Sequence, residues 1–340
     1  MDCRGQVPAI GDADDGEVWC LAHDSDFDSY RSLVAIGAAL FRRTDLSAKA
    51  RSSGVGNDGQ LPWLGLGAPP LYGKGTANDL PRSFPQGGYI VVGEALDTPR
   101  EFRVTFDCGA LGYNRIAGHG HADALAVLVS WEGDPLLVDA GTYCYNAAPE
   151  WRRFFRSTSA HNSLLVDGFD QSEYGASFLW LRDVNAVLHE ERRDDRMHVV
   201  HASHDGYLRL RDPVRHHRRV TLEADSGRLV VEDWLECRQP HDVTMHWHAA
   251  AAARLWPCET GWQLATTGHS LSLSVQGALA HHEIGVGCES PVQGWVSRRF
   301  YQREAAPVLV TRARLASSQI LRTVVERVAR HSAGREPGSR

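Results

Sequence analysis

Three histidines and one aspartate lie close together in the sequence, in a region otherwise rich in Val, Leu and Gly. His119 and His121 are two positions apart in GHGHAD. Asp139 ends the apolar run ALAVLVSWEGDPLLVD, and His161 follows in RSTSAHN. Residues i and i+2 of an extended segment point to the same face, so the pattern predicts that the first two imidazoles are neighbours.

Two histidines and a carboxylate are a suitable ligand set for zinc. All four side chains are candidate ligands, or one histidine stays outside the metal and transfers protons. The alternative interpretation is that these are scattered polar residues at strand ends. Two familiar sites containing His-x-His are excluded by the residues present. One needs a histidine where the chain has Ala124, and the other needs a glutamate where it has Leu125.

The segments around these residues predict a mainly β protein. From residue 84 to about 330, short alternating runs such as EFRVTFD, RRVTLEADSGRLVVEDWLE and DVTMHWHA are separated by turns. Roughly a dozen strands at this spacing favour a large antiparallel β-sandwich. Before it, the pattern over 25–46 predicts an amphipathic helix, and 52–80 is typical of a linker. We therefore expect a helical segment and linker over 1–80, a β-domain over 84–330 and a disordered tail over 331–340.

Composition excludes several classes of protein. The chain has 340 residues, a formal net charge of −6 and no basic tract, which argues against nucleic-acid binding. No apolar run is long enough for a membrane span, and no signal peptide is visible. Seven cysteines without a Cys-x-x-Cys pair argue against a disulfide framework or a cysteine-based zinc site.

Several separate motifs occur in an order that resembles one enzyme family. They are AIGDADDGEVW, the stretch GHGHADALAVLVSWEGDPLLVDAGTYCYN, the stretch WRRFFRSTSAHNSLLVDGFDQSE and HASHDGYLRLRDPVRHHRRVTL. Together they resemble the C-terminal β-domain of the heparinase II/III-like family of polysaccharide lyases, over most of residues 8 to about 250. The resemblance implies an α/α toroid followed by a large antiparallel β-sandwich, and cleavage of uronate polysaccharides by β-elimination.

The resemblance also implies roles for the four clustered residues. His119 matches the histidine of the catalytic region, whereas His121, Asp139 and His161 match a metal site, usually zinc, that braces the β-domain. The Asn and Tyr that the family carries on its toroid have no match here. We therefore expect only the last toroid helices in this chain and a missing N-terminal toroid, so that the chain alone is incomplete or inactive.

Further residues are predicted to contribute to the same site. Elimination needs a base for the C5 proton, an acid for the leaving oxygen and cationic or hydrogen-bonding groups for the uronate carboxylate. Tyr143 and Tyr145 are candidate catalytic phenols. The predicted substrate-binding residues are Arg156, Asn162, His204 and Tyr207.

Two other functions remain open at this point. One is a non-catalytic, metal-braced β-domain that binds acidic polysaccharide, and the other is a metal-dependent hydrolase of another fold. The resemblance further suggests a bacterial periplasmic or secreted protein.

Overall fold

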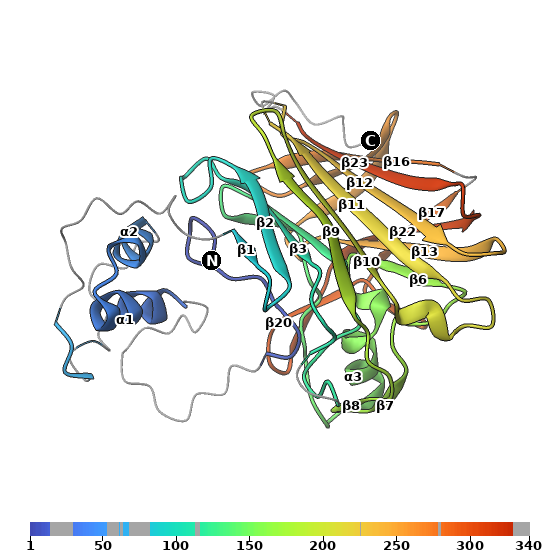
Figure 1. Ribbon diagram of the computed structural model, residues 1–340, viewed down its shortest axis with the longest axis horizontal. Coiled ribbons are helices and arrows are strands. Elements are labelled where there is room, and N and C mark those ends of the chain that lie inside the picture. Colours follow the sequence, from blue (N-terminus) through green and yellow to red (C-terminus); the bar gives the residue numbers. More distant parts are fainter. Residues whose placement is uncertain are drawn as a thin grey trace, which may run out of the picture.

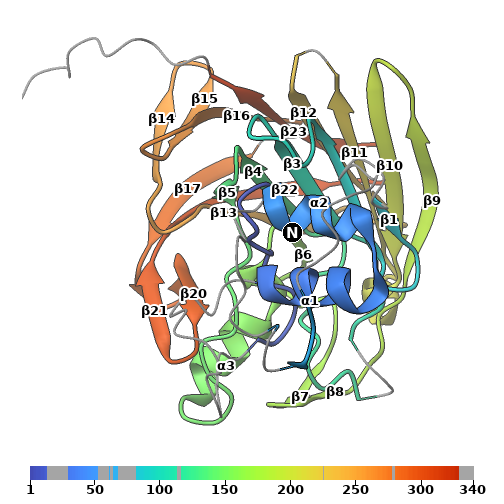
Figure 2. The same cartoon turned by 90° about the vertical axis from the view of Figure 1, so that its left-hand side faces the viewer.

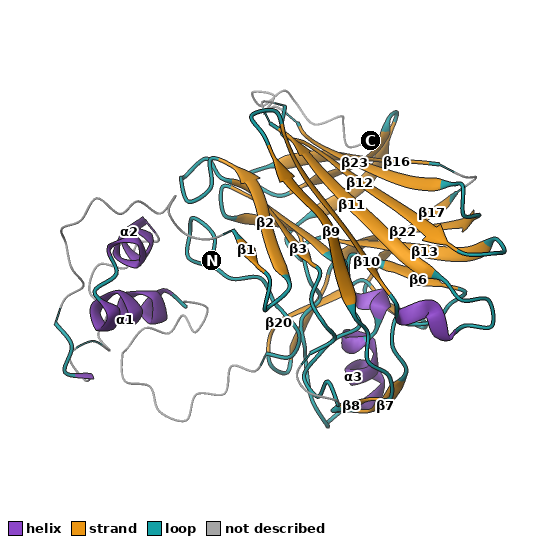
Figure 3. Cartoon of the chain, in the orientation of Figure 1, coloured by secondary structure: helices purple, strands orange, loops and turns teal. Residues whose placement is uncertain are grey.

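The computed structural model describes residues 1–13, 30–52, 61, 64–67, 82–112, 116–224, 226–277 and 280–328. Within these residues antiparallel strands dominate and three α-helices are present, which confirms the predicted mainly β fold (Figures 1 and 3). The predicted tail over 331–340 and most of the predicted linker over 52–80 lie outside the described residues.

The largest sheet has eight antiparallel strands in the order β14-β15-β16-β23-β12-β11-β10-β9. The strands are β9 (Ala186–Arg193), β10 (Met197–His204), β11 (Arg215–Glu223), β12 (Arg228–Glu236), β14 (Arg254–Cys258), β15 (Gly261–Ala265), β16 (Ser270–Gln276) and β23 (Ile320–Arg327). Burial alternates residue by residue along β11, as expected for a sheet with one face on the core. The predicted hairpin in ADSGRLVVEDWLE is confirmed, because β11 and β12 pair in antiparallel register.

Two smaller sheets face the same core. The first, in the order β1-β2-β3-β4-β5, contains β1 (Ser83–Phe84), β2 (Tyr89–Glu94), β3 (Phe102–Asp107), β4 (Val127–Trp131) and β5 (Asp134–Leu137). The second, in the order β17-β22-β13-β6, contains β6 (Leu164–Val166), β13 (His241–His248), β17 (His281–Val286) and β22 (Pro307–Leu315). Three two-stranded sheets complete the β-structure: β7 (Tyr174–Ala176) with β8 (Leu179–Trp180), β18 (Cys288–Glu289) with β19 (Val292–Gln293), and β20 (Trp295–Arg299) with β21 (Gln302–Ala305).

One continuous apolar core joins the three large sheets. It contains Phe106 of β3, Leu136 of β5, Val220 of β11 and Trp247 of β13, each at most 1% exposed. Burial of apolar surface on this scale is the main force that holds the layers together. This packing brings three turns to one edge of the sandwich: the turn before β4, the turn after β5 and the turn before β6. The clustered polar residues lie at this edge.

Two helices, α1 (Arg31–Phe41) and α2 (Thr44–Ser52), precede the sandwich and lie at its side (Figures 1 and 2). The single helix predicted over 25–46 is confirmed over 31–41, but the chain turns at Arg42, which has a left-handed φ of 51°. Lys49 of α2 attaches this pair to the β-structure, because its buried ammonium pairs with Asp97 and donates to the carbonyl of Asp2.

The third helix, α3 (Pro149–Arg156), lies beside β7 and β8 (Figure 1). Pro149 starts the helix at a position where a missing N–H has no cost. Trp151, Phe154 and Phe155 are buried on one side, and two arginines of this helix, Arg152 and Arg156, are also fully buried. The helix therefore fixes two cations next to the His-x-His loop.

None of the helices in the described ranges is long and apolar enough to cross a membrane. The six cysteines among the described residues are all unpaired: Cys3, Cys108, Cys144, Cys237, Cys258 and Cys288. The expectation of no disulfide framework agrees with this finding for the described part of the chain.

Candidate active site and metal centre

The carboxylate of Asp12 is the centre of the candidate site. Its Oδ1 lies 2.9 Å from Nε2 of His121, and its Oδ2 lies 3.1 Å from Nδ1 of His119. The buried guanidinium of Arg152 on α3 donates to both oxygens, with Nη2 at 2.6 Å from Oδ2. Asp12 therefore holds both histidines of the His-x-His motif and ties them to α3.

Local backbone contacts set the position of Asp12. Its N–H donates to the carbonyl of His119 at 2.9 Å. Gly11 before it has a φ of +56°, and a Cβ there would lie 2.7 Å from the same carbonyl. Only glycine suits this close approach of the two chain segments. His119 and His121 lie in a loop, and their shared contact with the Asp12 carboxylate keeps their imidazoles together, as the i, i+2 spacing predicted.

The structure brings His121, Asp139 and His161 into one group. One ligand atom of each residue lies within 4.8 Å of the others, and the two imidazole centroids are 5.3 Å apart. Nδ1 of His161 lies 2.6 Å from Oδ2 of Asp139. As predicted from the sequence, Asp139 follows a buried strand, β5, and His161 precedes β6.

Unpaired nitrogens indicate that this group suits a metal ion. Among the described residues, Nδ1 of His121 and Nε2 of His161 are buried and have no hydrogen-bond partner. A buried polar atom without a partner costs free energy unless something else contacts it. The Nε2–H of neutral His121 donates to Asp12, so its Nδ1 carries a free lone pair, as a metal ligand requires. The donor set of two imidazoles and a carboxylate fits zinc.

The electrostatics of the group are dominated by burial and by the pair of Asp139 and His161. Burial alone would lower the pKa of His161, but the charge and hydrogen bond of Asp139 raise that pKa to about 9. Burial would raise the pKa of Asp139, but the charge of His161 lowers it overall. Burial lowers the pKa of His121, so this imidazole is held neutral. Without a metal, the buried imidazolium of His161 therefore lies beside the neutral imidazole of His121.

The backbone around Asp139 positions its carboxylate. Its Oδ1 accepts the N–H of Gly141 at 2.8 Å. Gly141 has a φ of +84°, and a Cβ there would lie 2.0 Å from the carbonyl of Ser297. A larger residue would therefore separate this turn from the segment that contains β20.

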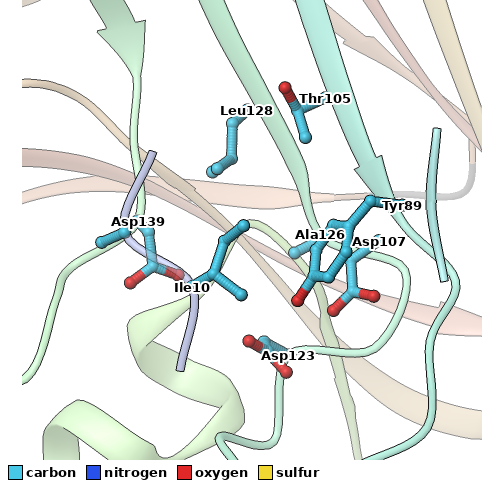
Figure 4. A pocket seen from close by; sticks show the side chains of 9 residues that line it. Ile10, Tyr89, Thr105, Asp107, Asp123, Ala126, Leu128 and Asp139 are labelled. Atoms are coloured by element: carbon cyan, nitrogen blue, oxygen red, sulfur yellow. The ribbon is translucent and has the colours of Figure 1, made fainter. Parts of the chain in front are cut away.

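A small cavity of about 20 Å³, room for about one water molecule, adjoins Asp139 (Figure 4). The carboxylates of Asp107 and Asp123 also line it, together with the ring of Tyr89. Burial, followed by the charge of Asp123, raises the pKa of Asp107. Burial also raises the pKa of Asp123. These two aspartates were not predicted as site residues, because nothing in their local sequence shows that they meet.

His119 is the exposed member of the histidine group. Its side chain is 68% exposed, whereas that of Asp12 beneath it is fully buried. Its ring lies 6.2 Å from the ring of Tyr145 and 5.5 Å from that of Phe178. The guanidinium of Arg152 lies over both of these rings. The structure thus brings His119 and Tyr145 together on one surface, and adds Phe178, which the sequence did not indicate.

Tyr143 lies apart from this surface. Its φ of +63° turns its side chain toward Trp151 and Phe155, and its hydroxyl accepts a hydrogen bond from Arg303 at 2.6 Å. The structure thus groups Tyr143 with α3 and β21, away from the imidazole of His119.

Two of the predicted substrate-binding residues have fully buried side chains. The side chain of Arg156 donates to the carbonyls of Gly120, Ala176 and Ser177. The side chain of Asn162 is buried in the same way. Its amide donates to the carbonyls of Val127 and Val138, and its oxygen accepts the N–H of His248. Both side chains brace the loops that carry the site.

His204 and Tyr207, the other two predicted substrate-binding residues, are also buried. His204 is fully buried, with Nε2 3.0 Å from Nδ1 of His216, whose other nitrogen contacts Asp233. The buried hydroxyl of Tyr207 donates to the carbonyl of Leu164 at 2.7 Å. Neither side chain is open to a polymer, because packing between β6, β10 and β11 encloses both.

Asp12 is the site residue that sequence reasoning missed. The motif AIGDADDGEVW is among those that carry the resemblance, but its sequence predicts no role for Asp12. A single buried aspartate in an acidic turn has no local signature, since its partners are more than 100 positions away.

Comparisons with known proteins identify the family of the chain and agree with its fold. Residues 76–323 match the family described as "Heparinase II/III-like, C-terminal". A search of curated protein sequences found no match.

Solved structures share the fold. A heparan sulfate lyase HepC mutant from Pedobacter heparinus superimposes with a TM-score of 0.70 at 13% sequence identity, over 97% of this chain and 45% of that one. A heparinase III superimposes with a TM-score of 0.67 at 15% identity, over 96% of this chain and 45% of that one. The chain therefore spans about 45% of the length of the solved chains it resembles.

Proposed function

Because the chain belongs to the heparinase II/III-like family, we propose that it is the β-domain of a polysaccharide lyase that cleaves uronate polysaccharide by β-elimination. The observation that carries this proposal is the exposed imidazole of His119, which lies on a buried Asp12 carboxylate shared with a metal-suited histidine. A solvent-facing histidine held by a buried carboxylate is the arrangement that proton transfer requires.

The reaction would remove the C5 proton of a uronate, form a C4–C5 double bond and break the bond from C4 to the leaving oxygen. Nδ1–H of His119 donates to Asp12, which leaves Nε2 as the free base. Nε2 of His119 would accept the C5 proton, and an acid would protonate the leaving oxygen. Asp12 would stabilise the imidazolium that forms, as the carboxylate partner does in other histidine-based sites.

Tyr145 and Phe178 would contact the sugar beside this base. Their rings are 5.1 Å apart and flank His119, so they offer apolar surface for a sugar ring next to the reacting carbon. The hydroxyl of Tyr145 is the candidate for the acid.

Zinc would be held by His121, Asp139 and His161. The bound ion would supply positive charge that fixes the His-x-His loop, the turn after β5 and the turn before β6 relative to one another. About one zinc per chain is expected at this site, and it should be lost in His121→Ala and His161→Ala. Equal zinc content in the wild type and both variants would refute this assignment.

An α/α toroid domain would complete the proposed substrate site and catalytic group. The solved chains of similar fold are about twice as long, which supports a parent protein whose α/α toroid completes the active site. A bacterial periplasmic or secreted location would suit a polysaccharide substrate and can be checked by cell fractionation.

The test is product analysis with uronate polysaccharides, for the chain alone and with a supplied toroid domain. A lyase generates unsaturated uronate ends with ultraviolet absorbance, and His119→Ala should abolish them while the protein remains folded. The matched control is His281→Ala, which alters an exposed histidine on β17. Saturated reducing ends would instead indicate hydrolysis and would contradict the proposal.

Binding without turnover is the second candidate, and one observation favours it. An open groove of about 950 Å³ lies between α3, β7 and the loops before β11 and β13. Five arginines line it: Arg153, Arg182, Arg209, Arg211 and Arg238. Four carboxylates also line the groove, so an anionic polysaccharide would bind only where the arginines outnumber these carboxylates. Saturable binding with no new sugar ends in either assay would favour this second function.

A further inference from the structure

Three histidines meet on the outer surface of the large sheet, on strands that carry none of the residues of the site described above. They are His189 of β9, His201 of β10 and His217 of β11, on three neighbouring strands (Figures 1 and 2). One ligand nitrogen of each lies within 4.8 Å of the others. The proposed catalytic chemistry makes no use of this group.

An irregularity in strand pairing produces the group. Along β10 and β9, His201 pairs with Glu190 and Ala202 pairs with Leu188, so His189 is an extra residue without a partner in the register. Such a bulge redirects the side chain of the extra residue. Here His189 lies with its ring centroid 4.7 Å from His201 and 5.6 Å from His217.

The spacing of two of the nitrogens suits coordination. Nε2 of His201 lies 3.2 Å from Nδ1 of His217. Two imidazole nitrogens bound at about 2.0–2.1 Å in tetrahedral geometry lie about 3.3 Å apart. Little rearrangement is therefore needed for one ion to contact both nitrogens.

Neighbouring groups contact a further ring nitrogen of two of these histidines, as commonly found around metal-binding histidines. Nε2 of His217 lies 3.5 Å from Oε2 of Glu236, and Nε2 of His189 lies 2.7 Å from the hydroxyl of Ser203. The ring of His217 also stacks on Trp234, at 5.1 Å and an angle of 10°. The orientation of the group is therefore set by the sheet and not by the histidines alone.

We propose that His189, His201 and His217 form a second metal site, which binds a divalent transition ion such as zinc on the outer face of the large sheet. Three histidines leave a fourth coordination position open to solvent or to a further ligand. The ion would join the edge strand β9 to β10 and β11, and would protect an edge that is otherwise able to pair with other chains.

The experiment is equilibrium dialysis of the whole chain against zinc at neutral pH, followed by elemental analysis. The wild type is expected to bind one equivalent of zinc more than His189→Ala and one more than His217→Ala. His198→Ala is the matched control, because it removes a half-buried histidine of β10 outside the group and should leave the zinc content unchanged. His121→Ala should lose a different equivalent, which separates this inference from the metal site of the proposed lyase.

A cobalt titration gives an independent readout. The His121→Ala variant should show the visible absorption of Co²⁺ in a tetrahedral nitrogen site. The double variant His121→Ala/His189→Ala should not show it. Equal zinc content in the wild type, His189→Ala and His217→Ala would overturn the proposal. The three histidines would then form a hydrogen-bonded group that binds no metal. Loss of zinc in His198→Ala as well would also overturn it, because the effect would then be general to the sheet.

Discussion

At the scale of single residues, Asp12 determines the properties of the candidate active site. It joins His119, His121 and Arg152, and both Asp12 and Arg152 have fully buried side chains. Burial would raise the pKa of Asp12, but the hydrogen bonds from His121 and Arg152 lower it to about 2. The carboxylate therefore remains charged at every pH at which the protein is expected to work.

Removal of that charge should destabilise the protein. Asp12→Asn leaves the buried guanidinium of Arg152 without its counter-charge, and such a loss typically costs about 3–5 kcal/mol. The free energy of unfolding from urea titration should fall by about this amount. Asp194→Asn, which breaks an exposed pair with Arg192, is the control and should change the free energy of unfolding far less. Equal effects of the two substitutions would show that Asp12 has no special role.

A second residue, His248 at the end of β13, should make stability depend on pH. Burial lowers its pKa from 6.5 to about 4, and its Nε2–H donates to the carbonyl of Ser159 at 2.9 Å. Between about pH 4 and pH 6.5, His248 binds a proton in the unfolded chain but not in the folded chain. The contribution to the free energy of unfolding is therefore complete above about pH 6.5 and decreases as pH falls toward 4, by up to about 3 kcal/mol.

The measurement is the urea midpoint of His248→Gln between pH 4 and pH 7, in zinc-free buffer. Glutamine keeps an N–H donor but does not titrate, so the variant should lose less stability on acidification than the wild type. His281→Gln on β17 is the control and should follow the wild type. An unchanged pH dependence in His248→Gln would contradict the prediction.

At the scale of elements, α3 holds the loop that carries the candidate site in place. Arg156 at its end binds the carbonyls of Gly120, Ala176 and Ser177, and its guanidinium lies 4.6 Å from the ring centroid of Trp180. Burial, followed by the charge of Arg152, lowers the pKa of Arg156 to about 10, so it remains cationic at neutral pH. The helix thus holds the His-x-His loop and the β7–β8 hairpin against one another.

Arg156→Lys should loosen this loop without any change of charge. A lysine has no planar fork and cannot reach three carbonyls at once, so buried acceptors lose their donors. We expect the free energy of unfolding to fall by about 3 kcal/mol and the zinc affinity to fall about tenfold or more. Arg153→Lys, on the exposed side of the same helix, is the control. Unchanged zinc affinity in Arg156→Lys would show that the loop is held independently of α3.

At the scale of the whole molecule, the net charge does not favour a polyanionic substrate. The chain has a formal charge of −6, so attraction must come from a local concentration of cations. The open groove with five arginines is one such region among the described residues, and Arg152 beneath Tyr145 and Phe178 is another cation near the proposed active site.

Charge reversal in the groove tests its contribution. Arg182→Glu combined with Arg238→Glu alters two exposed residues of the groove and should weaken binding of the proposed uronate polysaccharide about tenfold or more at low salt. The difference should shrink as salt is raised, because exposed charges are screened. Binding is measured by calorimetry, with the exposed Arg254→Glu on β14 as the control. Equal affinity of the double variant and the control would exclude the groove as a binding surface.

The amino-acid sequence by itself determined the mainly β fold and the types of residue at the candidate site. Period-two alternation marks strands such as β11 and β12 locally, and glycine and acidic turns mark their ends. The sequence also placed Asp139 after one buried strand and His161 before another, because strand ends are local features. The convergence of His121, Asp139 and His161 was therefore anticipated, while metal binding there stays a prediction.

Only the tertiary structure decided which polar residues face solvent. Arg156, Asn162, His204 and Tyr207 are as polar in sequence as His119, yet packing between distant strands buries all four. Asp12 lies 109 positions before His121, and His189 meets His217 only because of a bulge in β9. Burial and such long-range contacts depend on how the layers assemble, and no local pattern of residues encodes that assembly.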